Sequence, residues 1–403
     1  MTRKLDLRTG TPVWRAFRAP KVEARPLIRD VRTDVLVVGM GVSGAMIAEA
    51  LTAKGLGVVM IDRRGPLLGS TAATTALVQF EIDTPLTHLA GMIGKTKAER
   101  AWRRSRLSVF NLKARIAELG IDCRMAPRQS LYLAGNLLGA GALREEGQLR
   151  GLAGIRSTYL TPAALKDEFG IERAGALLSH DNLALDPIRL SAGLLDAAVA
   201  RGARLHAPAE ATGFESSRDG VMVATAGGPV VRAGSVVLAT GYELATVVPR
   251  APHRVISTWA IATRPQPRAL WPRQAMLWEA SDPYLYARTT HDGRVICGGE
   301  DEDFSDEERR DALTEGKTSA IAGKLTALFP ALDATPDYTW TGSFGTTSTG
   351  LPYVGRIPRR ANMFAVMGYG GNGITYSQIA GEILAAAIGG DRDADADLYA
   401  FGR

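Results

Sequence analysis

Hydrophobic and polar positions predict a βαβ unit near the start of the chain. Residues 34–38 form a β-branched apolar run typical of a buried parallel strand, and a helix is predicted at 44–55 with a second strand at 58–61. Residues 35–53 are nearly all apolar and about as long as a membrane span, but glycines and Glu49 interrupt them. A buried strand followed by a packed helix therefore explains this segment better than a transmembrane helix.

The same two periodicities predict elements along the rest of the chain. Helices are expected at 96–119, 189–201, 305–328 and 372–388, and strands at 130–134, 204–206, 211–214, 221–225, 236–239 and 364–367. The stretch 252–302 is also strand-like. Residues 1–30 contain three prolines and scattered arginines, so we predict an irregular arm there. Residues 65–80 are rich in Gly, Ser, Thr and Ala and predict a loop that runs into a short helix.

Composition is that of an ordinary globular protein, with 403 residues, 46% of them hydrophobic and 22% charged. The length indicates two domains. The formal net charge of +6 comes from scattered basic residues, which favour solvated faces over a nucleic-acid surface. Cys123 and Cys297 lie far apart, so a structural metal is not expected and a disulfide has no support. Residues 1–30 lack the apolar core of a signal peptide, so we expect a cytoplasmic protein without a transmembrane segment, whose oligomeric state stays open.

A glycine motif between the first strand and the first helix indicates a dinucleotide site. It reads Gly39-Met40-Gly41-Val42-Ser43-Gly44. Gly39 permits a tight turn, Gly41 lets the backbone approach a pyrophosphate, and Gly44 lets helix and strand pack closely. The helix N-terminus supplies free N–H groups for the phosphates. Asp62, at the end of the second strand and beside Arg63, can accept hydrogen bonds from ribose hydroxyls.

NAD and FAD share this motif, so other segments must distinguish them. In residues 69–76, small side chains would let a flat ring lie close to the backbone, and hydroxyls could reach phosphate or ribityl oxygens; a flexible loop is the alternative. The candidates there are Ser70, Thr71, Thr75 and Ala76. The strand at 236–239 ends in Thr240 and Gly241, which suits a sheet end beside a nucleotide, although an ordinary core strand would look similar.

A second glycine turn lies near the C-terminus, after a stretch that includes Gly355. A strand runs into the turn at 368–373 and then into a helix. Such a turn presents backbone N–H groups to an electron-rich atom, as the O2 edge of a reduced flavin requires. The candidate residues are Tyr369, Gly371, Asn372, Gly373, Ile374 and Thr375.

These motifs, in this order and spacing, resemble the D-amino-acid oxidase family of flavoproteins, which includes glycine oxidase and sarcosine oxidase. The resemblance implies an α/β fold with a discontinuous Rossmann-like FAD-binding domain and a second domain built on a mixed antiparallel sheet. We place the FAD domain at 31–90, 175–250 and 340–403, and the substrate domain at 91–174 and 251–339. The resemblance also implies that the backbone of Ala211 faces the adenine and that residues 73–79 flank the flavin ring.

Departures from the family concern the substrate. Relatives bind a substrate carboxylate through an arginine at one of two positions, which here hold Phe344 and Gln79. Arg288 could replace that arginine or could be an exposed strand residue. With Tyr286 and Tyr369, these residues are our candidates for the catalytic side of the site. Covalent attachment in relatives uses Cys or His in segments that contain neither here, so we expect non-covalent FAD.

The resemblance implies oxidation of a C–N bond in an amine or amino-acid-like substrate, by hydride transfer to flavin N5, giving an imine that hydrolyses. The alternatives are a dehydrogenase, or a subunit of a heteromeric amine dehydrogenase, that passes electrons to a quinone or carrier rather than to oxygen. The arm at 1–30 could contact such a partner. Without the family arginines, we expect an amine that lacks a free α-carboxylate, or one whose carboxylate lies remote from the oxidised carbon. Glu81 and Asp83 could attract a second cationic centre, or could simply lie exposed.

Overall fold

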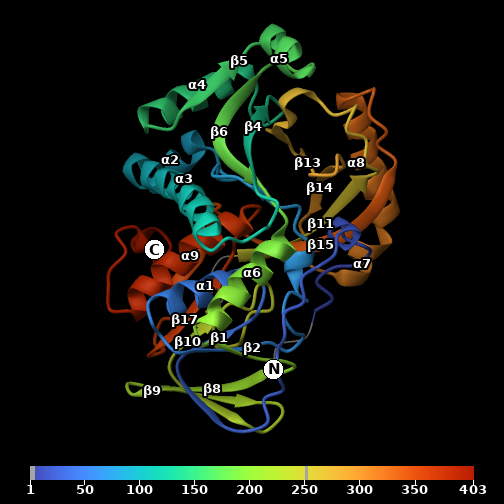
Figure 1. Ribbon diagram of the computed structural model, residues 1–403. Coiled ribbons are helices and arrows are strands. Elements are labelled where there is room, and N and C mark those ends of the chain that lie inside the picture. The colour runs from blue at the N-terminus through green and yellow to red at the C-terminus, as the bar shows by residue number, and fades with distance from the viewer. Residues whose placement is uncertain (1–4, 250–252) are drawn as a thin grey trace.

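The computed structural model describes residues 5–249 and 253–403, which fold as an α/β protein with two sheets (Figure 1). One sheet is mostly parallel and carries the glycine motif at the end of its central strand. The other is mixed and mostly antiparallel. The predicted fold class is therefore confirmed.

The parallel sheet is built around its central strand β1. Its strands run in the order β16 (Tyr353–Arg356), β17 (Met363–Met367), β10 (Val230–Leu238), β1 (Val31–Val38), β2 (Val58–Ile61) and β7 (Arg204–His206). All are parallel except β16, which runs antiparallel to β17. β9 (Gly220–Thr225) and β8 (Ala211–Ser217) form an antiparallel extension of β10.

Helices α1 (Val42–Ala53), α6 (Pro187–Ala200) and α9 (Gly373–Ile388) lie side by side against this sheet, and α3 (Lys95–Glu118) packs on α9 (Figure 1). Val35 and Val37 of β1 belong to the core beneath the helices, whereas Leu36 and Val38 belong to a separate core on the opposite face. Because successive strand residues point to opposite faces, β1 is buried on both sides. This explains its continuous apolar sequence.

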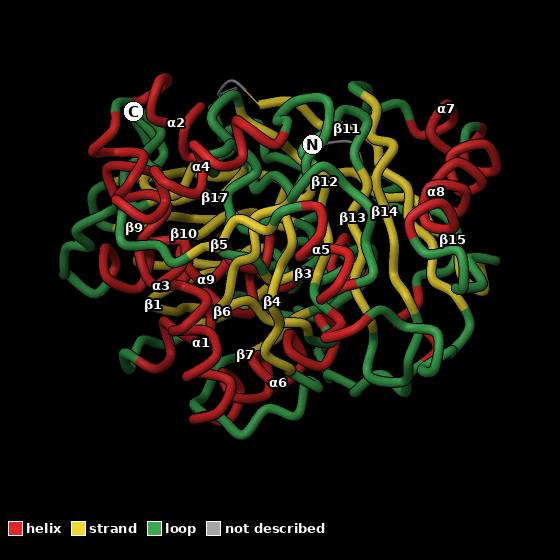
Figure 2. The backbone as a smooth tube through the Cα atoms, turned by 90° about the horizontal axis from the view of Figure 1, so that it is seen from above, coloured by secondary structure: helices red, strands yellow, loops and turns green. Residues whose placement is uncertain are grey.

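The mixed sheet forms the second half of the molecule. Its strands run in the order β15 (Pro336–Thr347), β11 (His253–Thr263), β14 (Val295–Glu302), β13 (Leu285–Thr289), β12 (Met276–Glu279), β4 (Ala126–Leu133), β6 (Ala176–Ala184) and β3 (Leu77–Val78), with β5 (Ser157–Leu160) paired to β6. Only β12 and β4 are parallel neighbours among these described strands. Figure 2 shows α7 (Glu307–Ala312) and α8 (Thr314–Leu328) at the outer side of this sheet.

Several elements differ from the sequence prediction. The helix expected at 305–328 is divided at Leu313 into α7 and α8. The sequence analysis did not identify α2 (Leu86–Ile93), α4 (Ala140–Leu152), α5 (Pro162–Phe169) or strands β5 and β6. In α4, three glycines weaken the helical pattern, which tertiary packing overrides. Short 3-10 turns complete the inventory at Val13–Ala16, Ser70–Ala72, Pro272–Gln274 and Ala396–Leu398.

The N-terminal arm is irregular, as predicted, but it is bound to both sheets. Gly10 bridges to Trp340 of β15, and Arg25 bridges to His206 of β7. Both β15 and β7 are edge strands, so the arm covers backbone groups that would otherwise face solvent. The part of the arm that the structure describes therefore contacts its own chain.

Sheet membership differs from the predicted domain boundaries at three strands. The ranges 31–90, 175–250 and 340–403 place β3, β6 and most of β15 with the FAD domain, whereas all three strands are hydrogen-bonded within the mixed sheet. The chain crosses between the halves several times, and a strand's sheet is fixed by its partners rather than by its sequence position. No helix in 5–249 or 253–403 is both long and apolar enough to cross a membrane.

Candidate active site

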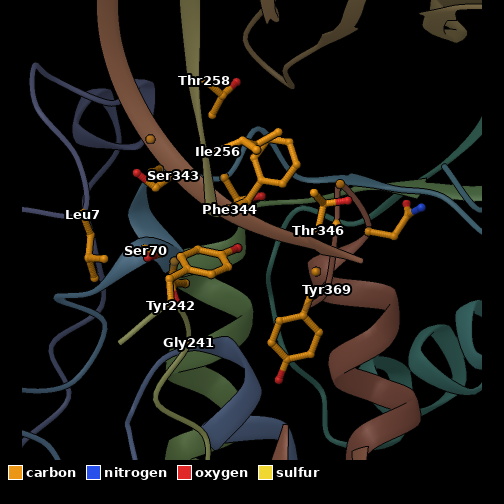
Figure 3. A pocket seen from close by; sticks show the side chains of 18 of the residues that line it. Leu7, Ser70, Gly241, Tyr242, Ile256, Thr258, Ser343, Phe344, Thr346 and Tyr369 are labelled. Carbon is orange, nitrogen blue, oxygen red and sulfur yellow. The ribbon is translucent and has the colours of Figure 1, made fainter. Parts of the chain in front are cut away.

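A cavity of about 750 Å³ lies where the two sheets meet. Residues that follow β1 and β10 line one side, which is where open α/β sheets bind ligands. Strands β11 and β15 line the opposite side. Figure 3 shows Ile256 and Phe344, which are register partners on these strands, beside Thr258 and above Tyr242.

The glycines of the first motif have distinct spatial roles. A Cβ on Gly39 would lie 2.3 Å from the Ala239 carbonyl oxygen, and one on Gly44 would lie 2.0 Å from the Gly39 oxygen. Both positions therefore tolerate no side chain because backbone blocks it. A Cβ on Gly41 would meet only the Thr71 hydroxyl, at 3.0 Å, and Gly41 lines the cavity. Gly41 is thus the residue whose missing side chain leaves room for a ligand.

The N-terminus of α1 opens onto the same cavity. Gly41 is its N-cap and provides no side-chain cap. Thr71 accepts a hydrogen bond from the Val42 N–H at 2.9 Å, which joins the 69–76 segment to the start of the helix. The first turn has further N–H groups that the helix itself does not use, and they suit a phosphate. These features fit the pyrophosphate of a dinucleotide.

Asp62 lines the cavity and also supports the glycine turn. Its carboxylate accepts backbone hydrogen bonds from Met40 at 2.8 Å, Arg64 at 2.7 Å and Gly65 at 3.0 Å. The sequence predicted a contact with ribose but did not reveal this structural role. Because the N–H of Met40 lies within the glycine motif, Asp62 fixes the loop that the pyrophosphate would contact.

Asp62→Ala is expected to reduce FAD affinity by roughly ten- to a hundredfold, since a hydrogen bond to a charged group is worth about 1.5–3 kcal/mol. Titration of the apoprotein with FAD, followed by the quenching of flavin fluorescence, measures this change. Asp219→Asn, on an exposed turn remote from the cavity, is the control for altered charge. Unchanged affinity in Asp62→Ala would show that the side chain supports neither the ribose nor the loop.

Arg63 and Arg64 are committed to acidic partners at the nucleotide end of the cavity. Both form ion pairs with Glu243, and Arg64 also donates to the Leu5 carbonyl oxygen at 2.8 Å. Burial opposes ionisation of Glu243, but its bonds to Arg64 and to the Leu5 N–H outweigh this and lower its pKa. Glu243 and Leu7 both line the cavity. The sequence analysis did not identify them, because they lie far from the glycine motif in the sequence and approach it only in the folded protein.

The two segments that resembled flavin-contacting regions are joined by hydrogen bonds. Asp83 accepts from the Gly371 N–H at 2.7 Å and from Asn372 Nδ2 at 3.1 Å. Thr375 Oγ1 donates to the Gln79 carbonyl oxygen at 2.7 Å. The Gly371 N–H is therefore used within the protein.

Most of the predicted site residues line the cavity together. They are Gly39, Gly41, Val42, Ser43, Asp62, Arg63, Ser70, Thr71, Thr75, Gln79, Ala211, Thr240, Gly241, Tyr286, Phe344, Tyr369, Gly371, Asn372, Gly373 and Ile374. Five predicted residues do not line it, namely Gly44, Ala76, Arg288, Gly355 and Thr375. Residues that the sequence analysis missed include Thr258, Trp278, Tyr132 and Asp301, whose strands lie far apart in the chain.

Arg288 lies outside the cavity and is not exposed. Its guanidinium donates to the carbonyl oxygens of Ala76 at 2.9 Å and Leu185 at 3.0 Å, and packs over the Trp14 ring. Burial lowers its pKa to about 9. Arg288 lies on the same face of β13 as Tyr286. Because Arg288 is two residues further along the strand, it lies behind the 73–78 segment. Both sequence interpretations of Arg288, as a carboxylate clamp and as an exposed residue, therefore disagree with its position.

A glycine motif at the end of a parallel strand, opening onto a cavity covered by a mixed sheet, is the arrangement of a dinucleotide-binding protein. The chain belongs to the DAO family of FAD-dependent oxidoreductases, which its residues 34–387 match. The resemblance inferred from the motifs is thereby confirmed.

Named relatives agree with this assignment. The chain is 27% identical over 393 residues to gamma-glutamylputrescine oxidoreductase of Escherichia coli (strain K12), covering 91% of this chain and 86% of that protein. The fold is similar to glycine oxidase from Geobacillus kaustophilus (TM-score 0.74, 22% identity, 90% and 96% covered). It is also similar to L-proline dehydrogenase from P. horikoshii (TM-score 0.77, 21% identity, 92% and 97% covered).

Proposed function

We propose that this enzyme oxidises a C–N bond in an amine that carries no carboxylate on the reacting carbon. The observation that carries the proposal is that the described residues lining the part of the cavity under the mixed sheet include no available cation. Phe344 and Gln79 line the cavity at the positions where the family resemblance expects arginine, and Arg288 lies outside it.

The arginines that do line the cavity have partners. Among the described lining residues these are Arg63, Arg64 and Arg254. The first two pair with Glu243, and Arg254 pairs with Asp303 in a largely exposed ion pair. A buried carboxylate without a cationic partner costs several kcal/mol, so the cavity disfavours an α-amino acid. The name of the Escherichia coli relative specifies gamma-glutamylputrescine, a substrate whose carboxylate is remote from the putrescine amine.

Bound FAD supplies the two-electron acceptor for this oxidation. The protein's part is to exclude water and orient the substrate. Ile256 and Phe344 present an apolar surface from β11 and β15, and Tyr286 approaches from β13. We propose that FAD is held non-covalently, because no His or Cys is among the described residues that line the cavity. Oxygen, a quinone or another carrier would then accept the electrons, and oxygen uptake measured beside quinone reduction distinguishes these acceptors.

Anaerobic flavin bleaching should be faster with 1-aminobutane than with either enantiomer of norvaline, its α-carboxylated counterpart. We expect a difference of roughly a hundredfold at low substrate concentration, since tenfold corresponds to about 1.4 kcal/mol and an unpaired buried carboxylate costs more. Phe344→Arg should reduce the preference for 1-aminobutane over norvaline, because it supplies a cation for the carboxylate. Phe344→Leu should leave that preference unchanged. Faster reduction by norvaline would contradict the proposal.

A further inference from the structure

One end of the cavity is strongly acidic. Glu81 and Asp83 follow Gln79 along one wall, and Asp301 at the end of β14 lines the wall formed by the mixed sheet. None of these three carboxylates forms an ion pair with a lysine, arginine or histidine of the described chain. The nearby Lys317 is paired instead with Glu300 and Glu302.

Several side chains at this end have buried polar atoms without a hydrogen-bond partner among the described residues, namely Gln79, Glu81, Trp278 and Asp301. Glu81 is only 2% exposed; its Oε1 accepts from the Ser130 hydroxyl, while Oε2 has no hydrogen-bond partner among the described residues. Gln79 is 8% exposed, and its Nε2 also lacks a partner there. Both residues line the cavity. Buried polar groups are normally hydrogen-bonded, so the acceptor Oε2 of Glu81 indicates a hydrogen-bond donor of a ligand at this place, whereas the Gln79 amide N–H needs an acceptor and cannot bind an ammonium group.

The hydrogen bonds of Asp83 and Asp301 hold their carboxylates at the cavity wall. Asp83 is fixed by Gly371 and Asn372, and Asp301 accepts a 2.5 Å hydrogen bond from the Tyr284 hydroxyl. Desolvation raises the pKa of each carboxyl to about 6, and the charge of Asp83 adds to the effect on Asp301. No lysine, arginine or histidine of the described chain forms an ion pair with either carboxylate; Lys317, whose charge lowers the pKa of Asp301, is itself paired with Glu300 and Glu302.

Aromatic rings complete this end of the cavity. Tyr132 and Trp278 are stacked with centroids 3.7 Å apart, and both line the cavity together with Tyr284. Aromatic faces attract ammonium groups and pack against methylene chains. The combination of unpaired carboxylates and aromatic walls matches an alkylammonium group better than a neutral or anionic one.

From this arrangement, and resting on the proposed amine oxidation, we infer that the preferred substrate is a diammonium compound, an alkyl chain with an amine at each end. One amine is oxidised, and the other is held as an ammonium ion by Glu81, Asp83 and Asp301 beside Tyr132 and Trp278. The second ammonium would donate to the unpartnered Oε2 of Glu81 and neutralise carboxylates that have no cation within the described chain.

The test compares 1,4-diaminobutane with 4-aminobutan-1-ol and 1-aminobutane, which replace the distal ammonium by a hydroxyl group and by a hydrogen atom. Anaerobic stopped-flow measurement of flavin reduction gives the Kd and the limiting rate separately. Calorimetry with the anaerobically reduced holoenzyme gives Kd again without turnover. We expect the diamine to bind at least tenfold more tightly than both monoamines in both measurements.

Variants test whether these carboxylates are responsible. Asp83→Asn and Asp301→Asn should each weaken diamine binding about tenfold while changing monoamine binding little, and added salt should weaken the diamine preferentially. Tyr284→Phe removes the hydrogen bond to Asp301 without removing a charge. We expect it to weaken diamine binding less than Asp301→Asn does. Asp219→Asn, an exposed residue remote from the cavity, should leave all values unchanged.

The outcomes separate the two proposals. If the diamine and monoamines reduce the flavin with equal Kd, or the Asn variants weaken all three ligands alike, the diammonium inference is overturned while amine oxidation stands. If no amine reduces the flavin, the proposed function fails, and calorimetry still decides whether the acidic end binds a dication. Diamine-selective binding that the Asp variants abolish supports a dication site at the acidic end in either case, and supports the diammonium substrate when the diamine also reduces the flavin.

Discussion

Gly41→Val is expected to yield a folded protein that retains no flavin. A side chain at Gly41 would project into the cavity, where the nearest atom is the Thr71 hydroxyl at 3.0 Å, so it would occupy the position of the pyrophosphate rather than collide with backbone. In the parent protein, acid precipitation should release FAD to the supernatant, as non-covalent binding requires. Absorbance of the purified variant near 450 nm should be lost, while circular dichroism remains that of the parent.

Two further glycine substitutions separate cofactor loss from unfolding. Gly44→Ala places a methyl group 2.0 Å from the Gly39 oxygen, so it should lower the free energy of unfolding even without FAD. Gly151→Ala lies in α4 with no atom within 4 Å and should be neutral or slightly stabilising. Flavin retention by Gly41→Val at the parent level would refute the assignment of the pyrophosphate site.

Glu146→Ala is expected to lower the free energy of unfolding by about 3–5 kcal/mol, because it leaves a buried arginine without its counter-ion. Glu146 and Arg150 are both fully buried on α4 and their Oε1 and Nε atoms are 2.7 Å apart. Glu146 also accepts from the N–H groups of Leu86 and Thr87 at the start of α2. Urea unfolding followed by circular dichroism measures the loss.

A matched control lies one residue away. Glu145 is exposed on the same helix, so Glu145→Ala should change the free energy of unfolding by no more than about 0.5 kcal/mol. The double variant Glu146→Leu/Arg150→Met replaces both charges by apolar groups and should recover much of the stability. Equal effects of the two single alanine variants would show that the buried pair is not the cause.

The pH dependence of stability gives an independent check. Burial opposes ionisation of Glu146, but the charge of Arg150 and the N–H donors of Thr87 and Leu86 outweigh it, and the pKa falls below its ordinary value of 4.5. A group whose pKa is lowered on folding contributes stability above its unfolded pKa and loses it as pH falls through the folded value. The gap between the parent and Glu146→Gln should therefore shrink as the pH is lowered below 4.5.

The ion pair also bears on the substrate end of the site. The guanidinium of Arg150 lies over Trp102 at 4.5 Å and 5.9 Å from the ring centroid of Tyr132. Tyr132 in turn stacks on Trp278 and lines the cavity. Stability of α4 and the shape of the aromatic wall therefore depend on the same buried charges.

The sequence alone determined the nucleotide end of this protein. Strand β1, the glycine turn, helix α1 and strand β2 are contiguous, and each local signal agrees with the others: a run of β-branched residues, glycines at fixed spacing and an acidic residue after the second strand. A local motif fixes its own backbone, so residues 34–62 indicated a Rossmann-like domain and a dinucleotide, and the later motifs distinguished FAD from NAD.

Only the tertiary structure decided the substrate end. Arg288 and Asp301 show why: the sequence made the first a candidate clamp and gave the second no role, whereas strand register and packing put Arg288 behind the 73–78 segment and Asp301 at the cavity wall. The acidic end joins residues from β4, β12 and β14, and Tyr284 just before β13, with the 79–83 segment. Whether a charge there is neutralised depends on neighbours distant in sequence, and no local pattern encodes that.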